Sequence, residues 1–199
     1  MVLFEDIYEK VVKDLELGLP QWLVYHNVKH TKYVLKQAVI IAEMENISYR
    51  DIFLVKIAAL YHDTGFLIDN KDHEILGCGI ASKDLKDKEL TAAELEKICG
   101  MIAATKIPQK PRNILEQIIA DADLEYLGTD QFEVYSLKLY EELLHFRPGL
   151  TSKEWDEIQI NFLSKHSYHT EYCKRTKEPI KQKNLELVRE RFAGVRRGM

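Results

Sequence analysis

The chain has 199 residues, of which 46% are hydrophobic and 30% are charged. These proportions are typical of a globular protein and exclude a disordered chain, a collagen and a disulfide-stapled miniprotein. The 28 basic and 32 acidic side chains give a formal net charge of −4, which argues against a dedicated nucleic-acid-binding protein. The length fits one domain whose core is large enough to fold without a metal, so a bound metal would serve function.

Hydrophobic residues recur at helical spacing along the chain, and glycine and proline lie at the edges of the periodic segments. The first predicted helix covers residues 2–17 and stops before Gly18. The second runs over 25–44, and the third begins near Asp51, a good N-cap, and continues to Gly65. Strand signals are weak, so the sequence predicts an all-α fold.

More helices are expected downstream. Thr91 and Glu94 form a capping box at the start of one of them, and Pro108 and Pro111 break the chain after it. The expected segments are 72–86, 91–104, 112–127, 130–146, 152–166 and 180–193.

The cysteines and the apolar segments bear on the compartment. Cys78, Cys99 and Cys173 lie far apart and form no CxxC pair, so we expect free thiols in a reducing cytoplasm. The N-terminal stretch has acidic residues near its start and does not have the pattern of a signal peptide. No apolar stretch approaches the roughly 20 residues of a membrane-spanning helix, so the expected location is cytoplasmic, without a membrane partner.

Histidines and aspartates form the informative pattern. His26 and His30 are four residues apart on a predicted helix, so both are expected on one face. His62 and Asp63 end a very apolar helix, where two neighbours can reach one ion beyond the helix end. Later, IADADLEYLG places carboxylates in an apolar segment, where a carboxylate is costly unless it is paired or metal-bound. Mixed imidazole and carboxylate ligands suit a divalent ion such as Mn, Fe, Co, Ni or Zn, with Mg as an alternative.

Several motifs carry a family resemblance. YHNVKHT (25–31) is similar to the YHNxxH signature of cyclic-nucleotide phosphodiesterases and of a bacterial group of predicted phosphohydrolases, and ALYHDTG (59–65) matches the HD motif. IAATKIPQKP, IIADADLEYLG and FLSKHSYHT resemble later segments of that bacterial group. Over about residues 22–170 the chain thus resembles the HD-domain superfamily of metal-dependent phosphohydrolases. The resemblance implies a phosphodiesterase-like multi-helix bundle, here one domain over 1–199 with a core at 22–146 and C-terminal helices at 152–193 packed on it.

Carried over residue by residue, the resemblance implies a metal site and a proton donor. The implied metal ligands are His30, His62, Asp63 and Asp123. Asp123 is preferred to Asp121 because the family's last aspartate stands in an A-D-L setting. His26 matches the phosphodiesterase residue that protonates the leaving oxygen, a role that suits a histidine near its ordinary pKa.

One departure from the family bears on the number of metal ions. Members with two or more ions have extra histidines between HD and the last aspartate, and here His73 is a candidate while Thr105 to Ile107 contain none. We therefore expect one tightly held ion, with a second, weaker site at Asp63 and His73 left open. Glu74 and Asp121 are candidates for that site or for orienting the ligands.

The expected reaction is hydrolysis of a phosphate ester, as a phosphomonoesterase or phosphodiesterase, by attack of metal-bound hydroxide. The expected substrate is a nucleotide or another small phosphorylated metabolite. Lys106, Lys110 and Arg112 form a small cationic group that could contact its phosphate. The sequence lacks P-loop, Rossmann and nucleophile-elbow motifs. It leaves the oligomeric state open, with a homodimer as one option.

Three other hypotheses about the function stay open. The first is a non-catalytic metal or nucleotide sensor on the same fold, and the second is a di-iron oxygenase, ranked low because residues 64–122 supply too few histidines. The third is a helical interaction module without metal. His145, His166 and His169 lie in polar contexts and are expected at the surface.

Overall fold

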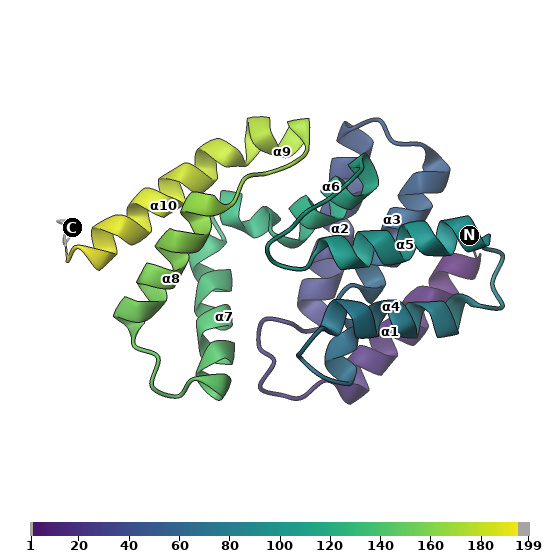
Figure 1. Cartoon of the computed structure of the whole chain (residues 1–199), viewed down its shortest axis with the longest axis horizontal. Coiled ribbons are helices and arrows are strands. Elements are labelled where there is room, and N and C mark those ends of the chain that lie inside the picture. Colours follow the sequence, from purple (N-terminus) through teal and green to yellow (C-terminus); the bar gives the residue numbers. More distant parts are fainter. Residues whose placement is uncertain (1, 195–199) are drawn as a thin grey trace. The chain divides into compact units, whose positions relative to one another are not determined.

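The computed structural model describes residues 2–194. Within this range the chain forms ten α-helices and two short 3-10 helices and has no strand, which confirms the all-α prediction (Figure 1). None of these helices has the length and apolar character needed to cross a lipid bilayer. The helices divide into two compact units, one up to Asp123 and one from Leu124 onward. This division falls inside the predicted core of 22–146, and the arrangement as a single domain stays a prediction.

The helices agree closely with the predicted segments. The first unit holds α1 (Val2–Gly18), α2 (Val28–Met44), α3 (Tyr49–Tyr61), η1 (Thr64–Leu67), α4 (His73–Leu85), α5 (Ala92–Ala104) and α6 (Ile114–Asp123). The second unit holds η2 (Glu125–Gly128), α7 (Phe132–Phe146), α8 (Ser152–Lys165), α9 (Glu171–Thr176) and α10 (Glu178–Phe192).

Two predicted helix starts are wrong, and capping explains both. Asn27 is the N-cap of α2, because its side chain accepts hydrogen bonds from the backbone N–H groups of Lys29 and His30. A cap residue has extended backbone, so His26 lies before the helix and not on it. Ser48, not Asp51, caps α3 and accepts the Asp51 N–H. The capping box of Thr91 and Glu94 at the start of α5 is confirmed.

Helix α3 is the centre of the first unit. Its residues from Leu54 to Tyr61, Lys56 apart, are buried, so the helix is apolar on nearly every side. Helices α1, α2, α5 and α6 all pack against it. A helix that is apolar all round has to be surrounded by protein, and this one delivers the residues after its C-terminus into the interior.

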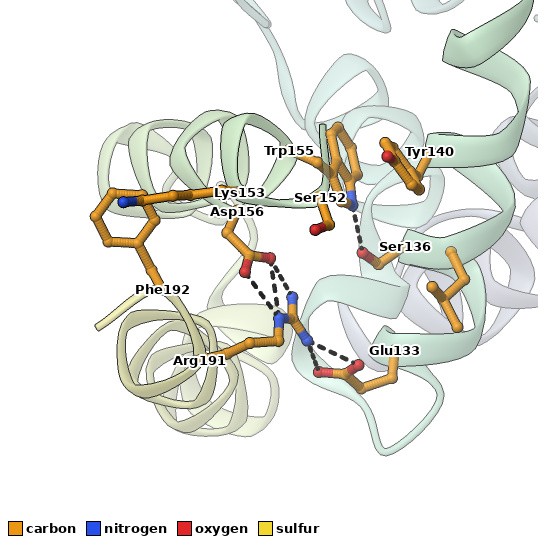
Figure 2. Close-up of a pocket in the computed structure, with 10 residues that line it drawn as sticks. Glu133, Ser136, Tyr140, Ser152, Lys153, Trp155, Asp156, Arg191 and Phe192 are labelled. Carbon is orange, nitrogen blue, oxygen red and sulfur yellow. Dashed lines mark hydrogen bonds and ion pairs between the residues drawn. The ribbon is translucent and has the colours of Figure 1, made fainter. Parts of the chain in front are cut away.

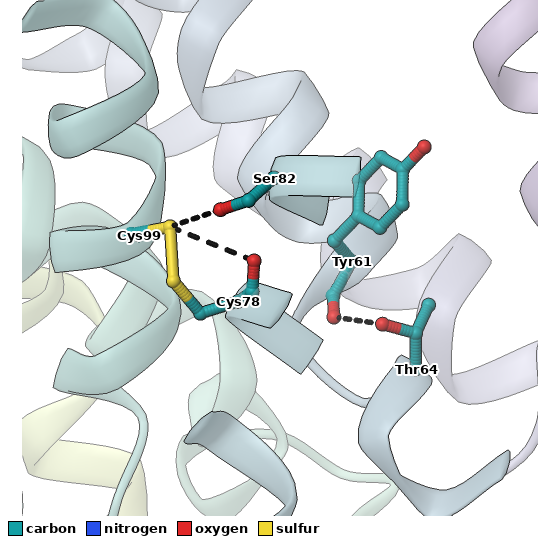
Figure 3. The surroundings of a disulfide bond; sticks show 5 residues. All are labelled: Tyr61, Thr64, Cys78, Ser82 and Cys99. Atoms are coloured by element: carbon teal, nitrogen blue, oxygen red, sulfur yellow. Dashed lines mark hydrogen bonds between the residues drawn. A yellow bond between two sulfur atoms is a disulfide. The ribbon is translucent and has the colours of Figure 1, made fainter. Parts of the chain in front are cut away.

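A disulfide bond joins Cys78 of α4 to Cys99 of α5 (Figure 3). The expectation of free thiols is therefore wrong for these two residues, and Cys173 is a free, buried thiol. The two half-cystines are 21 residues apart in sequence, but the packing of α4 on α5 brings their Cα atoms to 5.1 Å, within disulfide range. The bond also removes the cysteine argument for a reducing compartment.

In the second unit, an ionic clamp formed by the exposed Arg191 and Glu133 and the buried Asp156 connects three helices. Arg191 of α10 donates hydrogen bonds to Asp156 of α8 at 2.7–3.1 Å and to Glu133 of α7 at 2.9–3.0 Å (Figure 2). Trp155 and Tyr140 stack beside it with ring centroids 5.8 Å apart. Together these side chains help to line a cavity of about 370 Å³, in which both carboxylates are paired with Arg191 and Lys153 lies over the Phe192 ring.

His166 is not the surface residue that the sequence suggested. Its ring is partly buried, and its Nε2 atom is buried without a hydrogen-bond partner among residues 2–194. The fully buried Lys181 of α10 approaches Nδ1 at 3.3 Å and also donates to the His166 carbonyl. Burial and the Lys181 ammonium lower the pKa of His166 to about 3.

Thiol titration of the unreduced chain tests the disulfide. In denaturant without reductant, a thiol reagent should react with Cys173 alone, because Cys78 and Cys99 are bonded to each other. After reduction, all three should react. Closing a loop of this length is expected to stabilise the fold by about 3 kcal/mol, so Cys99→Ser should unfold at lower urea concentration. Three reactive thiols in the unreduced chain would contradict the assignment.

The buried His166 predicts a pH dependence of stability. An unfolded histidine titrates near pH 6.5, and the folded His166 stays neutral down to about 3, so the unfolded chain binds the extra proton between these values. The free energy of unfolding should therefore fall as the pH drops from 7 to 4, by about 3 kcal/mol more in the wild-type protein than in His166→Gln. Urea unfolding at a series of pH values measures this difference, and parallel curves for the two proteins would refute it.

Candidate metal centre

Two histidines of the first unit face each other in the interior. His30 lies in the first turn of α2 and is 2% exposed, and His62 follows α3 and is fully buried. Their Nε2 atoms are 3.3 Å apart. The other ring nitrogen of His62, Nδ1, lies 2.8 Å from the Ala59 carbonyl oxygen. A carbonyl only accepts, so Nδ1 carries a proton and Nε2 is the ring nitrogen that faces the centre of the cluster.

Two carboxylates complete the cluster. Asp123, the last residue of α6, places Oδ1 3.1 Å from His30 Nε2 and 3.6 Å from His62 Nε2. Asp63 places Oδ2 3.1 Å from His62 Nε2 and 3.4 Å from His30 Nε2. The ligand atoms of His30, His62 and Asp123 all lie within 4.8 Å of one another, a spacing that one ion can bridge. The structure thus brings together the four ligands that the sequence predicted.

The electrostatics of the cluster favour a bound cation. Burial raises the pKa of Asp123, but hydrogen bonds from His30 and His62 lower it to about 2. Burial likewise raises the pKa of Asp63, and the charge of His62 holds it far below its usual range. Burial lowers the pKa of His62, yet Asp63 and Asp123 raise it well above its ordinary value. Two buried carboxylates therefore stay negative and attract positive charge, from a proton or from a metal ion.

The hydrogen-bond pattern points to a metal ion as the better source of that charge. Asp63 Oδ2 is buried and makes no hydrogen bond within residues 2–194, although two imidazole nitrogens lie close to it. The fixed proton on Nδ1 of His62 is the arrangement that metal-ligating histidines adopt. Two imidazoles and two carboxylates also match the donor set of a borderline divalent cation.

Helix ends place these ligands. The Thr64 hydroxyl donates to the Tyr61 carbonyl at 2.8 Å and so fixes the turn after α3, which carries His62 and Asp63 (Figure 3). At the other wall, Gln109 Nε2 donates to the Ala120 carbonyl in the last turn of α6, at 2.8 Å. The sequence analysis did not single out Gln109.

Gly65 lets the segment after HD pass directly against α4. A Cβ atom at Gly65 would lie 1.9 Å from the His73 carbonyl oxygen, closer than any side chain permits. This contact brings the first turn of α4 to the site: His73 Nε2 is 3.8 Å from Asp63 Oδ1, and Glu74 is buried. Asp121 is buried as well, but it is not part of the cluster of facing ligand atoms.

His26 reaches the site from the loop before α2. Its ring centroid is 5.9 Å from that of His30 and 6.3 Å from that of His73. Phe66 of η1 stacks on His26 and on His73. The sequence analysis left Phe66 between two predicted helices, and its position directly after HDTG was the available signal.

The cationic group after α5 is engaged in ion pairs. Lys106 bonds Asp72 at 2.6 Å, and Arg112 bonds Glu116 at 2.9 Å. Lys110 is exposed. Asp72 is the residue before His73, so Lys106 lies on the side of the first unit where α4 begins, whereas the partner of Arg112 is in the first turn of α6.

Comparisons with known proteins agree with this geometry. Residues 27–125 match the family model of the HD domain. The crystal structure of Bacillus subtilis YpgQ in complex with ADP is similar with a TM-score of 0.63 and 17% sequence identity, over 95% of this chain and 97% of that chain. At this identity the likeness shows a shared fold. No curated protein matches the chain. The predicted resemblance to the HD superfamily is confirmed.

Metal content tests the cluster. Protein purified without chelator should carry a stoichiometric divalent ion, and His62→Gln and Asp123→Asn should each lose it, because each removes one ligand from the cluster. His145→Gln, a histidine of the second unit, serves as the control. Elemental analysis gives the metal content, and saturating Mn²⁺ at about 100 times its Kd should stabilise the wild-type protein by about 2.7 kcal/mol. Unchanged metal in both ligand variants would exclude the site.

A pair of glycine substitutions tests the close approach at Gly65. Gly65→Ala should lower the free energy of unfolding by at least about 2 kcal/mol, because its Cβ collides with backbone. Gly79→Ala is the matched control, since Gly79 lies inside α4 with nothing within 4 Å of a Cβ, and it should raise stability by about 0.5–1 kcal/mol. Equal effects of the two substitutions in urea unfolding would show that the contact is not tight.

Proposed function

We propose that this chain, which belongs to the HD superfamily, is a metal-dependent phosphohydrolase that cleaves a phosphate ester of a nucleotide or another small phosphorylated metabolite. The observation that carries the proposal is the buried set of His30, His62, Asp63 and Asp123, whose ligand atoms face one another. A divalent cation held by these four residues would polarise water and neutralise charge on a phosphoryl oxygen.

The metal is one of Mn, Fe, Co, Ni, Zn or Mg. Two imidazole nitrogens support a borderline ion such as Mn, Fe, Co, Ni or Zn over Mg, which prefers oxygen ligands. Four protein ligands leave room for water and a substrate oxygen in an octahedral shell.

A weaker second ion is proposed beside the first. The two oxygens of Asp63 face different groups, since Oδ2 points to the paired imidazoles and Oδ1 lies 3.8 Å from His73 Nε2. Glu74 Oε1 is 3.5 Å from the same nitrogen of His73. Asp63 could therefore bridge two ions. We propose that Asp121 orients groups around the first site. It is buried, and it lies two residues before Asp123 in the sequence.

The proton donor in the proposed reaction is His26. The attacking water would lose one proton to solvent as its oxygen joins phosphorus, the bond from phosphorus to the leaving oxygen would break, and the His26 imidazolium would give its proton to that oxygen, so that a neutral alcohol departs. Its ring lies within contact distance of the site histidines yet is only partly buried, which suits a group that meets substrate. Asp63 holds the cation and, with it, the attacking water.

A nucleotide is the proposed substrate class. The structurally similar YpgQ was crystallised in complex with ADP, which supports nucleotide binding on this fold. Lys106 is the better candidate for phosphate contact, because its pair with Asp72 is about half exposed on both sides and exchanges partners at little cost. Arg112 would first have to leave the buried Glu116.

A turnover assay with metal-loaded protein tests the proposal. Wild-type protein should release phosphate or nucleoside from a panel of nucleotides and simple phosphoesters, and Asp63→Asn should abolish this. His26→Gln should lower kcat by about 100-fold with its metal content unchanged, because it removes only the proton donor. His145→Gln is the control and should match the wild type. No turnover, together with a nucleotide-induced rise in melting temperature, would refute hydrolysis and favour the sensor.

A further inference from the structure

Phe66 is in contact with two histidines of the candidate site at once. Its ring centroid is 4.6 Å from that of His26 with an interplanar angle of 24°, and 4.2 Å from that of His73 with an angle of 25°. Both geometries are stacked. The three rings come from three separate segments, the loop before α2, η1 and the first turn of α4.

The backbone around Phe66 fixes where this ring lies. The Phe66 N–H donates to the Asp63 carbonyl at 3.1 Å, which ties the residue to the turn that carries two metal ligands. Gly65 sits directly against the His73 carbonyl, so the chain before Phe66 packs closely on the first turn of α4. The ring is therefore held at a set position relative to Asp63.

His26 needs such an external support. It precedes the cap residue Asn27, so the backbone of α2 does not hold it in the way it holds His30. Its ring packs on Tyr25, edge to face at 4.7 Å, and on the face of Phe66.

We infer that Phe66 is a positioning residue that holds the His26 ring, against His73, in the orientation from which it protonates the leaving oxygen. This inference rests on the proposed function. In this role the Phe66 side chain contacts His26 and His73 and does not meet the phosphoryl group. Phe66 therefore affects the rate only through His26. Its effect should depend on whether the leaving group needs a proton, which a purely structural packing role would not produce.

Leaving groups of different basicity reveal the signature. A 4-nitrophenolate departs without a proton at neutral pH, whereas an alkoxide such as a ribose oxygen requires one. Phe66→Leu keeps an apolar side chain but removes the aromatic face. It should lower kcat for a ribose or alkyl phosphate ester by about tenfold to hundredfold, and lower kcat for the 4-nitrophenyl ester less than about threefold. KM and metal content should stay the same.

Matched variants isolate the path through His26. Phe66→Tyr retains an aromatic face and should restore most of the rate on the alkyl ester. The double variant His26→Gln with Phe66→Leu should be no slower than His26→Gln alone, because Phe66 then has no proton donor to position. Ile68→Ala, at a residue two positions on that is 63% exposed, should leave both rates unchanged.

A measurement without turnover accompanies the kinetics. The ring protons of His26 and His73 should show ring-current shifts in the NMR spectrum of the wild-type protein, and Phe66→Leu should remove them. Unchanged shifts, or an equal loss of rate on both esters, would overturn the positioning role and leave the proposed function intact. If the wild-type protein hydrolyses neither ester, the proposed function fails and the inference fails with it.

Discussion

Two imidazoles and two carboxylates meet in the interior of the first unit, and the charge balance among them constrains everything around them. Isolated buried carboxylates are too costly to keep in an apolar bundle. Here the negative charge of Asp63 and Asp123 persists because His62 and His30 lie within 3.1–3.6 Å. The proton on Nδ1 of His62 leaves Nε2 as the ring nitrogen that faces the cluster, where a cation would complete the set of donors.

Helix ends satisfy this constraint without disturbing the helices. Adjacent side chains in the middle of a helix point in different directions, whereas residues at its ends are free to turn toward one point. His62 and Asp63 follow the last turn of α3, Asp123 ends α6, and His30 lies in the first turn of α2. The most buried helix of the unit, α3, thus carries a histidine–aspartate pair to its end while its own length stays apolar.

A second layer of contacts holds the surroundings of the cluster. Gly65 allows η1 to lie against α4, and Phe66 then stacks on the histidines from two other segments. Helix α4 is itself joined to α5 by the Cys78–Cys99 bond. Cys78 lies five residues after His73. The covalent link therefore limits how far the first turns of α4 can move relative to α5.

The sequence by itself determined most of the helices and named four residues that the structure brings together. Periodicity and local caps act over a few residues, so the pattern located α1, α4, α5, α7, α8 and α10 nearly as they are, and the order of H, HD and D named His30, His62, Asp63 and Asp123. The placement of His26 on the helix was wrong. The Asn27 side chain accepts a hydrogen bond from the His30 N–H, and this cap makes α2 begin after Asn27.

Only the tertiary structure decided which distant residues meet. The Cys78–Cys99 bond, the stack of Phe66 on His26 and His73, and the support of α6 by Gln109 all join segments whose separation along the chain carries no distance information. His166 looked like a surface residue because its neighbours in sequence are polar, yet α10 brings Lys181 over it. Burial and contact across helices depend on how the elements pack, and packing is set by the whole chain rather than by any local stretch of it.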